Sequence, residues 1–162
     1  SSSRSIILGG LGLLYKPVKK IELYANFSQN YRSINFNDMR VVNPNFKVDP
    51  DLKDETGYTA DGGIRVTLKD LLYVDFSVYY LRYNDRIGTV LKEDKQTYVL
   101  YRYRTNISDS RNIGAECFAE LDMIKLFNKN AKHKLSIYVN ASYTDARYLS
   151  SQQSGFNDKL VE

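Results

Sequence analysis

The sequence is poor in the residues on which most catalytic, metal and cross-linked sites depend. Its 162 residues include one cysteine, one histidine and no tryptophan. The single cysteine, Cys117, excludes a disulfide within the chain, and no zinc-type spacing is present. The single histidine, His133, excludes a histidine metal cluster and leaves most nucleophile–base triads without a base. We therefore expect no enzyme, no metal site and no cofactor.

Long apolar runs are also missing. No run approaches the length of about 18 residues that a membrane-spanning helix needs. Three prolines and nine glycines are too few for a low-complexity chain. The chain starts at Ser1 without a methionine and shows no signal peptide, so we expect a fragment or a processed product.

The positive charge is not concentrated in one arm. The net charge is +4 and the pI is near 9.0, with lysines gathered at residues 16–20 and 125–134. Small separate clusters favour solvated turns over a nucleic-acid surface. A basic patch with interleaved tyrosines is the alternative, because such surfaces bind single strands. We expect no nucleic-acid partner, because no RNA-binding strand motif accompanies the charge.

Apolar and polar residues alternate with a period of two. In residues 21–30, Ile21, Leu23, Ala25 and Phe27 share one face, while polar residues and a tyrosine take the other. The pattern recurs at residues 58–68, 74–80, 114–121 and 135–144, and the apolar stretch 6–15 adds one more candidate. The chain also holds 14 tyrosines, which favour strands. The alternation predicts an all-β chain of about six long strands.

Strand length separates two kinds of all-β protein. Each predicted strand has about ten residues or more, whereas ordinary strands average about five or six. A strand that crosses a bilayer at a tilt needs about 9–11 residues. We therefore predict a segment of an antiparallel transmembrane β-barrel. A soluble β-sandwich is the alternative, and it requires short strands and a second sheet that buries the apolar faces.

The predicted connections differ in length. Residues 16–20 and 69–72 form short turns, whereas residues 34–56 form a long polar loop and a second polar loop lies near residues 92–95. Outer-membrane barrels have short periplasmic turns and long extracellular loops. The connection from residue 122 to 133 is longer than this rule predicts. We expect an aromatic girdle near the long-loop end, made of Tyr31, Tyr83, Tyr101, Tyr103 and Tyr148.

Five short motifs together resemble one family. They are ELYANFSQNYR at 22–32, DPDLKDETGY at 49–58, YNDRIG at 83–88, RTN at 104–106 with RNIGAE at 111–116, and ASYTDA at 141–146. In this order and spacing they resemble strands and loop ends of TonB-dependent receptors, nearest in type to the ferric-citrate receptors. The resemblance covers nearly the whole chain.

The resemblance implies an outer-membrane importer of ferric chelates, driven by the TonB complex. Such receptors have a barrel of about 22 strands with an N-terminal plug. Residues 1–162 would be part of the barrel domain, without the plug, the TonB box or the C-terminal strands. The implied partners are the TonB complex, a ferric chelate as cargo and outer-membrane lipid. A receptor of the same fold for a glycan, cobalamin or heme is the alternative.

Four residues around the start of the long loop are candidates for ligand binding: Arg32, Asn35, Asn37 and Arg40. A ferric carboxylate chelate is anionic, so arginine binds it through charge-assisted hydrogen bonds and asparagine adds neutral ones. The resemblance also places Asn35 where ferric-citrate receptors have a ligand-contacting glutamine. The alternative is a solvated loop without a ligand.

Several acidic residues have a plainer interpretation. Asp49, Asp51, Asp54 and Glu55 offer oxygens for calcium, but their spacing favours an exposed acidic start of the next strand. By alternation, four charged residues point into the lumen of the barrel: Arg65, Asp75, Glu116 and Glu120. Barrel lumens are routinely polar, so these residues need no catalytic role. The same alternation places Cys117 on the lipid side.

Overall fold

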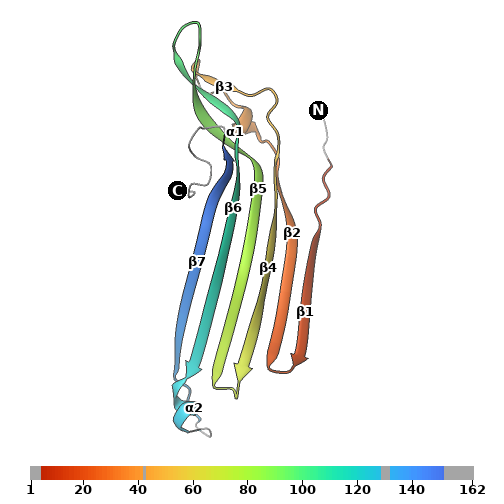
Figure 1. The fold of residues 1–162 in the computed structure, drawn as a ribbon, viewed down its shortest axis with the longest axis vertical. Helices are drawn as coiled ribbons and strands as arrows, with labels where there is room; N and C mark the ends of the chain where they lie inside the picture. The colour runs from red at the N-terminus through yellow and green to blue at the C-terminus, as the bar shows by residue number, and fades with distance from the viewer. Residues whose placement is uncertain (1–4, 42, 129–131, 152–162) are drawn as a thin grey trace.

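Six long antiparallel strands dominate the fold. The computed structural model describes residues 5–41, 43–128 and 132–151. The long strands have 9 to 23 residues and are β1 (Gly10–Val18), β2 (Ile21–Arg32), β4 (Glu55–Leu68), β5 (Leu72–Glu93), β6 (Leu100–Asp122) and β7 (Ser136–Ser151). Figure 1 shows them side by side. The predicted all-β fold and the six predicted strands are confirmed.

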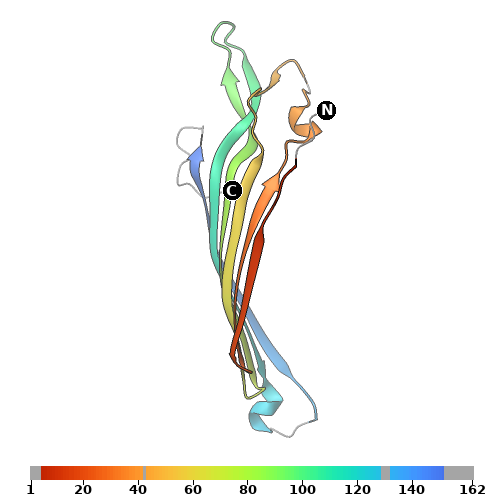
Figure 2. The same ribbon diagram turned by 90° about the vertical axis from the view of Figure 1, so that its right-hand side faces the viewer.

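The strands form a single sheet one layer thick. Its order is β1-β2-β4-β5-β6, and β7 pairs with the far side of β6. Figure 2 shows the sheet nearly edge-on, as a curved layer with no second sheet against it among the described residues. A β-sandwich needs two packed sheets. The soluble sandwich alternative is therefore wrong for the described part of the chain.

Three short elements escape prediction from the sequence. They are α1 (Phe36–Met39) and β3 (Phe46–Val48) in the long loop, and α2 (Met123–Phe127) in the connection before β7. Asp122 caps α2 by accepting hydrogen bonds from the N–H groups of Ile124 and Lys125. This capped turn explains why that connection is longer than its neighbours. Within the described residues, no helix is long and apolar enough to cross a membrane.

One face of the sheet is apolar and exposed, and we call it the outer face. On β5 this face carries Leu72, Val74, Phe76, Val78 and Tyr80. The strand pairing places apolar residues of the other strands in the same rows, and Val78, Leu13 and Val139 are 49%, 63% and 63% exposed. Cys117 lies between Phe76 and Ala141 on this face, as predicted.

The opposite, inner face is polar and tied together by side-chain contacts. Arg65 Nη1 lies 2.6 Å from Glu22 Oε1, and its Nε lies 3.0 Å from Asp75 Oδ2. The Tyr24 hydroxyl donates to Asp75 across 3.2 Å, and the Arg65 guanidinium lies 4.3 Å from the Tyr24 ring centre. The register places Glu116 and Glu120 on this same face, as predicted.

Apolar burial is nearly absent from this sheet. Among the described hydrophobic residues, only Phe46 and Val90 are buried, at 8% and 6% exposure. A water-soluble domain buries its apolar faces, whereas a bilayer barrel turns them outward and keeps a polar lumen. The placement of the faces is therefore that of a transmembrane barrel segment.

The aromatic girdle differs from the predicted one. All five predicted tyrosines lie towards the long-loop end, but the register places Tyr83 and Tyr148 on the inner face. The register keeps Tyr31 on the outer face, and the outer-face rings of Phe27, Tyr58 and Tyr80 lie beside it with neighbouring ring centres 5.8 and 5.7 Å apart. Tyr83 lies three residues beyond the outer-face residue Tyr80 in a regular stretch of the pairing, so alternation alone turns it to the inner face.

The two faces should respond differently to an added charge. Val78→Arg places a guanidinium in lipid and should lower the free energy of unfolding by about 2–4 kcal/mol. Ser142→Arg adds the same charge on the inner face opposite Glu116, and it should cost less than about 1 kcal/mol. Urea unfolding of the full-length protein in lipid vesicles measures both. Equal costs for the two variants would contradict the assignment of faces.

Candidate functional site

The long loop between β2 and β4 is docked on β6 rather than extended away from the sheet. Its strand β3 runs parallel to β6 and pairs Phe46, Lys47 and Val48 with residues 102–104. Backbone hydrogen bonds of 2.8 Å hold both ends of this pairing, from Arg102 N to Asn45 O and from Asp49 N to Arg104 O. The loop therefore covers the edge of β6 beyond the point where β7 pairing ends (Figure 1).

A second clamp lies where the loop returns to β4. Asn106 accepts a hydrogen bond from Lys53 N at 2.8 Å and donates to Lys53 O at 2.9 Å. The same amide donates to Asp85 O at 2.6 Å, beside the bulge of β5 where Asp85 has a φ of 55°. One side chain thus joins the loop, β5 and β6, and it fixes the loop over this end of the sheet.

A buried carboxylate lies at the centre of the docked loop. Asp38, in α1, is 5% exposed. Arg32 Nη2, from the end of β2, lies 3.1 Å from Asp38 Oδ1 and 3.0 Å from Oδ2. Arg104 Nη1, from β6, lies 3.7 Å from Oδ1 and donates to Asn37 O at 2.7 Å. Two arginines from different strands therefore converge on one carboxylate.

Arg32 also connects the site to the neighbouring strand. Its Nη1 lies 2.6 Å from Glu55 Oε1, and that oxygen accepts a hydrogen bond from Ile87 N at 2.9 Å. The Arg32 side chain remains 43% exposed. A cavity of about 150 Å³ lies beside it and is also lined by Asn30, Glu55 and Tyr83. Arg32 can therefore reach an added anion without leaving its place in the sheet.

The four predicted binding residues have different roles in the structure. Asn35 caps α1: its Oδ1 accepts from Asp38 N at 3.0 Å, and Asp38 Oδ2 accepts from Asn35 N at 3.1 Å. Asn37 and Arg40 have exposed side chains, on α1 and directly after it. The structure thus brings Arg32 and Asn35 together around Asp38 and leaves Asn37 and Arg40 in solvent. Ligand binding by these residues stays a prediction.

Three residues of this cluster are missed by the sequence analysis: Asp38, Glu55 as an arginine partner, and Arg104. The Asn35-x-x-Asp38 spacing matches a capping box with aspartate at the third position, so Asp38 has a local sequence pattern. Arg104 has none, because 66 residues separate it from Asp38 and only the docking of the loop brings them together.

The acidic segment before β4 accepts hydrogen bonds from the loop and from β6. Asp54 accepts from Ile34 N at 2.9 Å and from the Tyr31 hydroxyl at 2.7 Å. Asp49 Oδ2 accepts from Thr105 Oγ1 at 2.5 Å, and this hydrogen bond lowers the pKa of Asp49 below its ordinary value. Among the described residues, no group of three or more metal-ligating side chains is suited to hold a metal ion.

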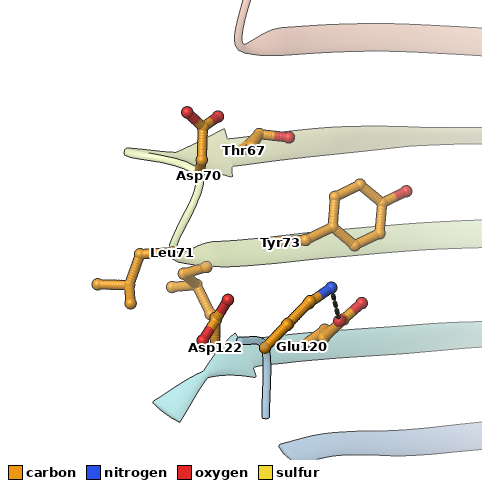
Figure 3. A pocket seen from close by; sticks show the side chains of 8 residues that line it. Thr67, Asp70, Leu71, Tyr73, Glu120 and Asp122 are labelled. Atoms are coloured by element: carbon orange, nitrogen blue, oxygen red, sulfur yellow. Dashed lines mark hydrogen bonds and ion pairs between the residues drawn. The ribbon is translucent and has the colours of Figure 1, made fainter. Parts of the chain in front are cut away.

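A second hollow, of about 310 Å³, lies at the short-turn end (Figure 3). Lys134 Nζ lies 2.7 Å from Glu120 Oε1 there, beside Tyr73 and Thr67. Asp122 also lines it, but its Oδ1 caps α2. The hollow is a mixed polar and apolar recess at the short-turn edge of the sheet, and it lies at the opposite end of the strands from the arginine site.

Removing the central carboxylate should release the loop. Asp38→Asn removes the charge that both arginines share, so local opening of residues 33–54 should become easier by about 1–3 kcal/mol. Hydrogen exchange of the loop amides in the full-length protein measures the change. Asp51→Asn is the control, because Asp51 is an exposed acid of the same loop. Equal protection of the loop in both variants would contradict the role of Asp38.

Acid should weaken the docking of the long loop on β6 through Asp49, which accepts a hydrogen bond from Thr105. Its pKa is lowered from 3.8, so its stabilising effect is complete above that pH and is lost as the pH falls through the lower pKa of the folded state. Loop amides should therefore lose protection below a pH of about 4. Asp49→Asn should show less additional loss in acid than the unchanged protein. Identical acid profiles would exclude Asp49 as a contributor.

Comparisons with known proteins agree with this geometry. The family model described as TonB dependent receptor-like, beta-barrel matches residues 1–160. The FrpB iron transporter from Neisseria meningitidis (F3-3 variant) is similar with a TM-score of 0.65 at 15% identity, over 96% of this chain and 21% of that one. No curated protein matches the chain.

Two further solved structures share the fold. The copper transporter OprC has a TM-score of 0.62 at 17% identity, over 87% of this chain and 21% of that one. The unliganded ferric citrate transporter FecA has a TM-score of 0.61 at 19% identity, over 93% of this chain and 20% of that one. The chain thus spans about a fifth of these proteins. It belongs to the β-barrel family of the TonB-dependent receptors, which are outer-membrane receptors and transporters of Gram-negative bacteria.

Proposed function

We propose that this chain forms an arc of an outer-membrane transporter that imports an anionic ferric chelate, with energy from the TonB complex. Family membership supports a receptor of this kind. Two of the similar structures are named as an iron transporter and a ferric citrate transporter. The observation that carries the choice of cargo is the pair of arginines, Arg32 and Arg104, that converge on a carboxylate.

The sheet edges support a larger barrel around this arc. Among the described residues, β1 pairs only with β2, and β7 pairs only with β6. Lipid offers no hydrogen bonds, so an unpaired strand edge is not stable within the hydrocarbon layer. We propose that further strands on both sides close a barrel of about 22 strands around a plug. Residues 1–162 are then one part of the barrel domain.

The arginine site recognises the chemistry of a carboxylate chelate. Arg32 already binds a carboxylate, because its Nη2 donates to both oxygens of Asp38, and charge-assisted hydrogen bonds of this kind are among the strong ones. Citrate-type chelates present the same group. A bound chelate therefore competes with Asp38 for Arg32 or adds to it through the exposed side of the guanidinium.

The other candidate residues supply weaker contacts around this centre. Asn35 uses its carbonyl oxygen as a helix cap, so its amide NH₂ group is what remains to donate to a ligand. Asn37 offers a further neutral donor at the solvent side of α1. Arg40 is exposed and attracts anions to the loop before they reach Arg32.

A different cargo is the second candidate. OprC is named as a copper transporter, so the fold is compatible with more than one metal cargo. A glycan, cobalamin or heme also remains an alternative, because a polar loop with asparagines and aspartates offers hydrogen bonds to ligands other than a ferric chelate. A neutral glycan differs from ferric citrate in charge, and removal of an arginine therefore discriminates between these two cargoes.

Loss of one exposed charge should weaken chelate binding. Arg40→Gln in the full-length receptor should raise the Kd for ferric citrate about three- to tenfold, and Arg32→Gln should raise it by more than tenfold. Titration of the purified receptor in detergent, followed by uptake of radioactive iron in a strain without other receptors, measures both. Lys95→Gln is the control, since Lys95 is an exposed cation at the tip of the β5–β6 hairpin.

The outcomes separate the cargoes. A neutral glycan that binds with unchanged affinity to the Arg32→Gln and Arg40→Gln variants, together with no binding of ferric citrate, would replace the proposed cargo. Uptake that does not depend on TonB would overturn the proposed energy source.

A further inference from the structure

Four charged groups compensate each other at the arginine site. Arg32 contacts two carboxylates: its Nη2 lies 3.0 Å from Asp38 Oδ2, and its Nη1 lies 2.6 Å from Glu55 Oε1. Arg104 Nη1 lies 3.7 Å from Asp38 Oδ1. The two guanidinium groups are thus already occupied by carboxylates of the chain itself. An anion from solution has to displace one of these carboxylates to take the full set of donors.

One of the two carboxylates is fixed by the sheet. Glu55 lies opposite Arg32 in the regular register of β2 and β4. Its Oε1 also accepts a hydrogen bond from Ile87 N of β5 at 2.9 Å. Moving Glu55 would leave this half-buried N–H without its partner, which costs free energy. Glu55 is therefore the permanent partner of Arg32.

The other carboxylate is carried by a short helix whose apolar residues are exposed. Within α1, only Asp38 is buried. Phe36 and Met39 of the same helix are 76% and 57% exposed. Polar contacts therefore seat α1 on the strands: Asp38 binds both arginines, and Asn37 O accepts a hydrogen bond from Arg104 at 2.7 Å. Displacing Asp38 breaks these contacts but exposes little apolar surface.

Both arginines have a second anchor that does not depend on Asp38. Arg32 keeps its ion pair with Glu55. The Arg104 guanidinium lies 5.3 Å from the ring centre of Phe46, a residue that is 8% exposed where β3 pairs with β6. Because both arginines lie against the same oxygen of Asp38, one small anion can contact both. The place of the Asp38 carboxylate is thus a preorganised site for the same group on a ligand.

We propose that Asp38 is a built-in competitor that determines which anions occupy the arginine site. The inference deepens the proposed function and rests on it for the identity of the cargo. Asp38 is tethered beside the arginines, so its carboxylate is present at an effective concentration of about millimolar or more. Every ligand has to displace this carboxylate at the same cost in free energy. The cost sets an affinity threshold for the site.

The threshold separates two classes of anion. A single carboxylate replaces Asp38 with an equivalent group and offers nothing further, so it does not fill the site at ordinary concentrations. A chelate with several carboxylates contacts Arg32 and Arg104 with different groups. Its second contact is made within the same complex and therefore adds affinity without a second association step. Only anions of this second class exceed the threshold and free α1 from the arginines.

The first test compares affinities in the full-length receptor, purified in neutral detergent at constant ionic strength. Calorimetric titration gives the Kd for ferric citrate, and saturation-transfer NMR detects acetate, the single-carboxylate probe. Asp38→Asn should lower the Kd for ferric citrate about tenfold and make acetate binding saturable at about millimolar concentrations. The unchanged protein should show no saturable acetate binding in this range. Asp51→Asn, which removes the same charge from an exposed position of the loop, should behave as the unchanged protein.

The second test measures whether ferric citrate displaces α1 in the unchanged protein. Asn35 N and Asp38 N donate hydrogen bonds of 3.1 and 3.0 Å within the cap of α1. If Asp38 is displaced, the amides of residues 33–41 should exchange faster with ferric citrate than without it. Simple repulsion by the Asp38 charge would leave their exchange unchanged, and an added ligand contact would slow it. Either result would overturn the built-in competitor.

The outcomes separate this inference from the proposed cargo. Ferric citrate that binds the unchanged protein and Asp38→Asn with equal Kd would overturn the competitor and leave the cargo proposal standing. Ferric citrate that binds neither protein would contradict the cargo. In that case, a gain of acetate binding in Asp38→Asn would still support the competitor, because acetate tests the site without the chelate.

Discussion

The structure depends on one constraint: backbone hydrogen bonds within a bilayer have no water to replace them. Each peptide group of a spanning strand must pair with a neighbouring strand. Continuous antiparallel pairing along β2, β4, β5, β6 and β7 satisfies this requirement over the length of the sheet. Side chains do not have to build a buried core, and apolar burial is nearly absent in the described residues. The fold is therefore held by pairing, and the side chains are available for the environments on the two faces.

This constraint explains why much of the fold is predictable from the sequence. Period-two alternation is a local property, and paired strands in lipid must keep it over their whole length. Ile21 to Phe27 and Leu135 to Ala141 therefore give β2 and β7 directly. The alternation does not predict that β5 continues to Glu93 or that β6 begins at Leu100. This part of the hairpin projects beyond the sheet, where no lipid enforces the alternation.

The candidate site is predictable only in part, for the opposite reason. Arg32 and Asn35 are found because they lie at the end of a recognisable strand and at a recognisable cap. The convergence of Arg104 on Asp38 depends on β3, which pairs with β6 from across two intervening strands. Nothing local in residues 46–48 specifies that partner. When a loop docks on a strand that is distant in the sequence, the resulting contacts are determined by the tertiary structure alone.

Bulges in β5 and β6 mark the change from the membrane sheet to the end that carries the docked loop. Below residue 83 the register is regular and side-chain parity decides whether a residue meets lipid or lumen. The register shifts between Tyr83 and Ile87, where Asp85 adopts a positive φ and Asn106 clamps the loop. A shift of one residue exchanges the faces of a strand. Beyond the bulges the strand pair no longer serves the membrane sheet alone, because Arg104 of β6 meets Asp38 of the docked loop there.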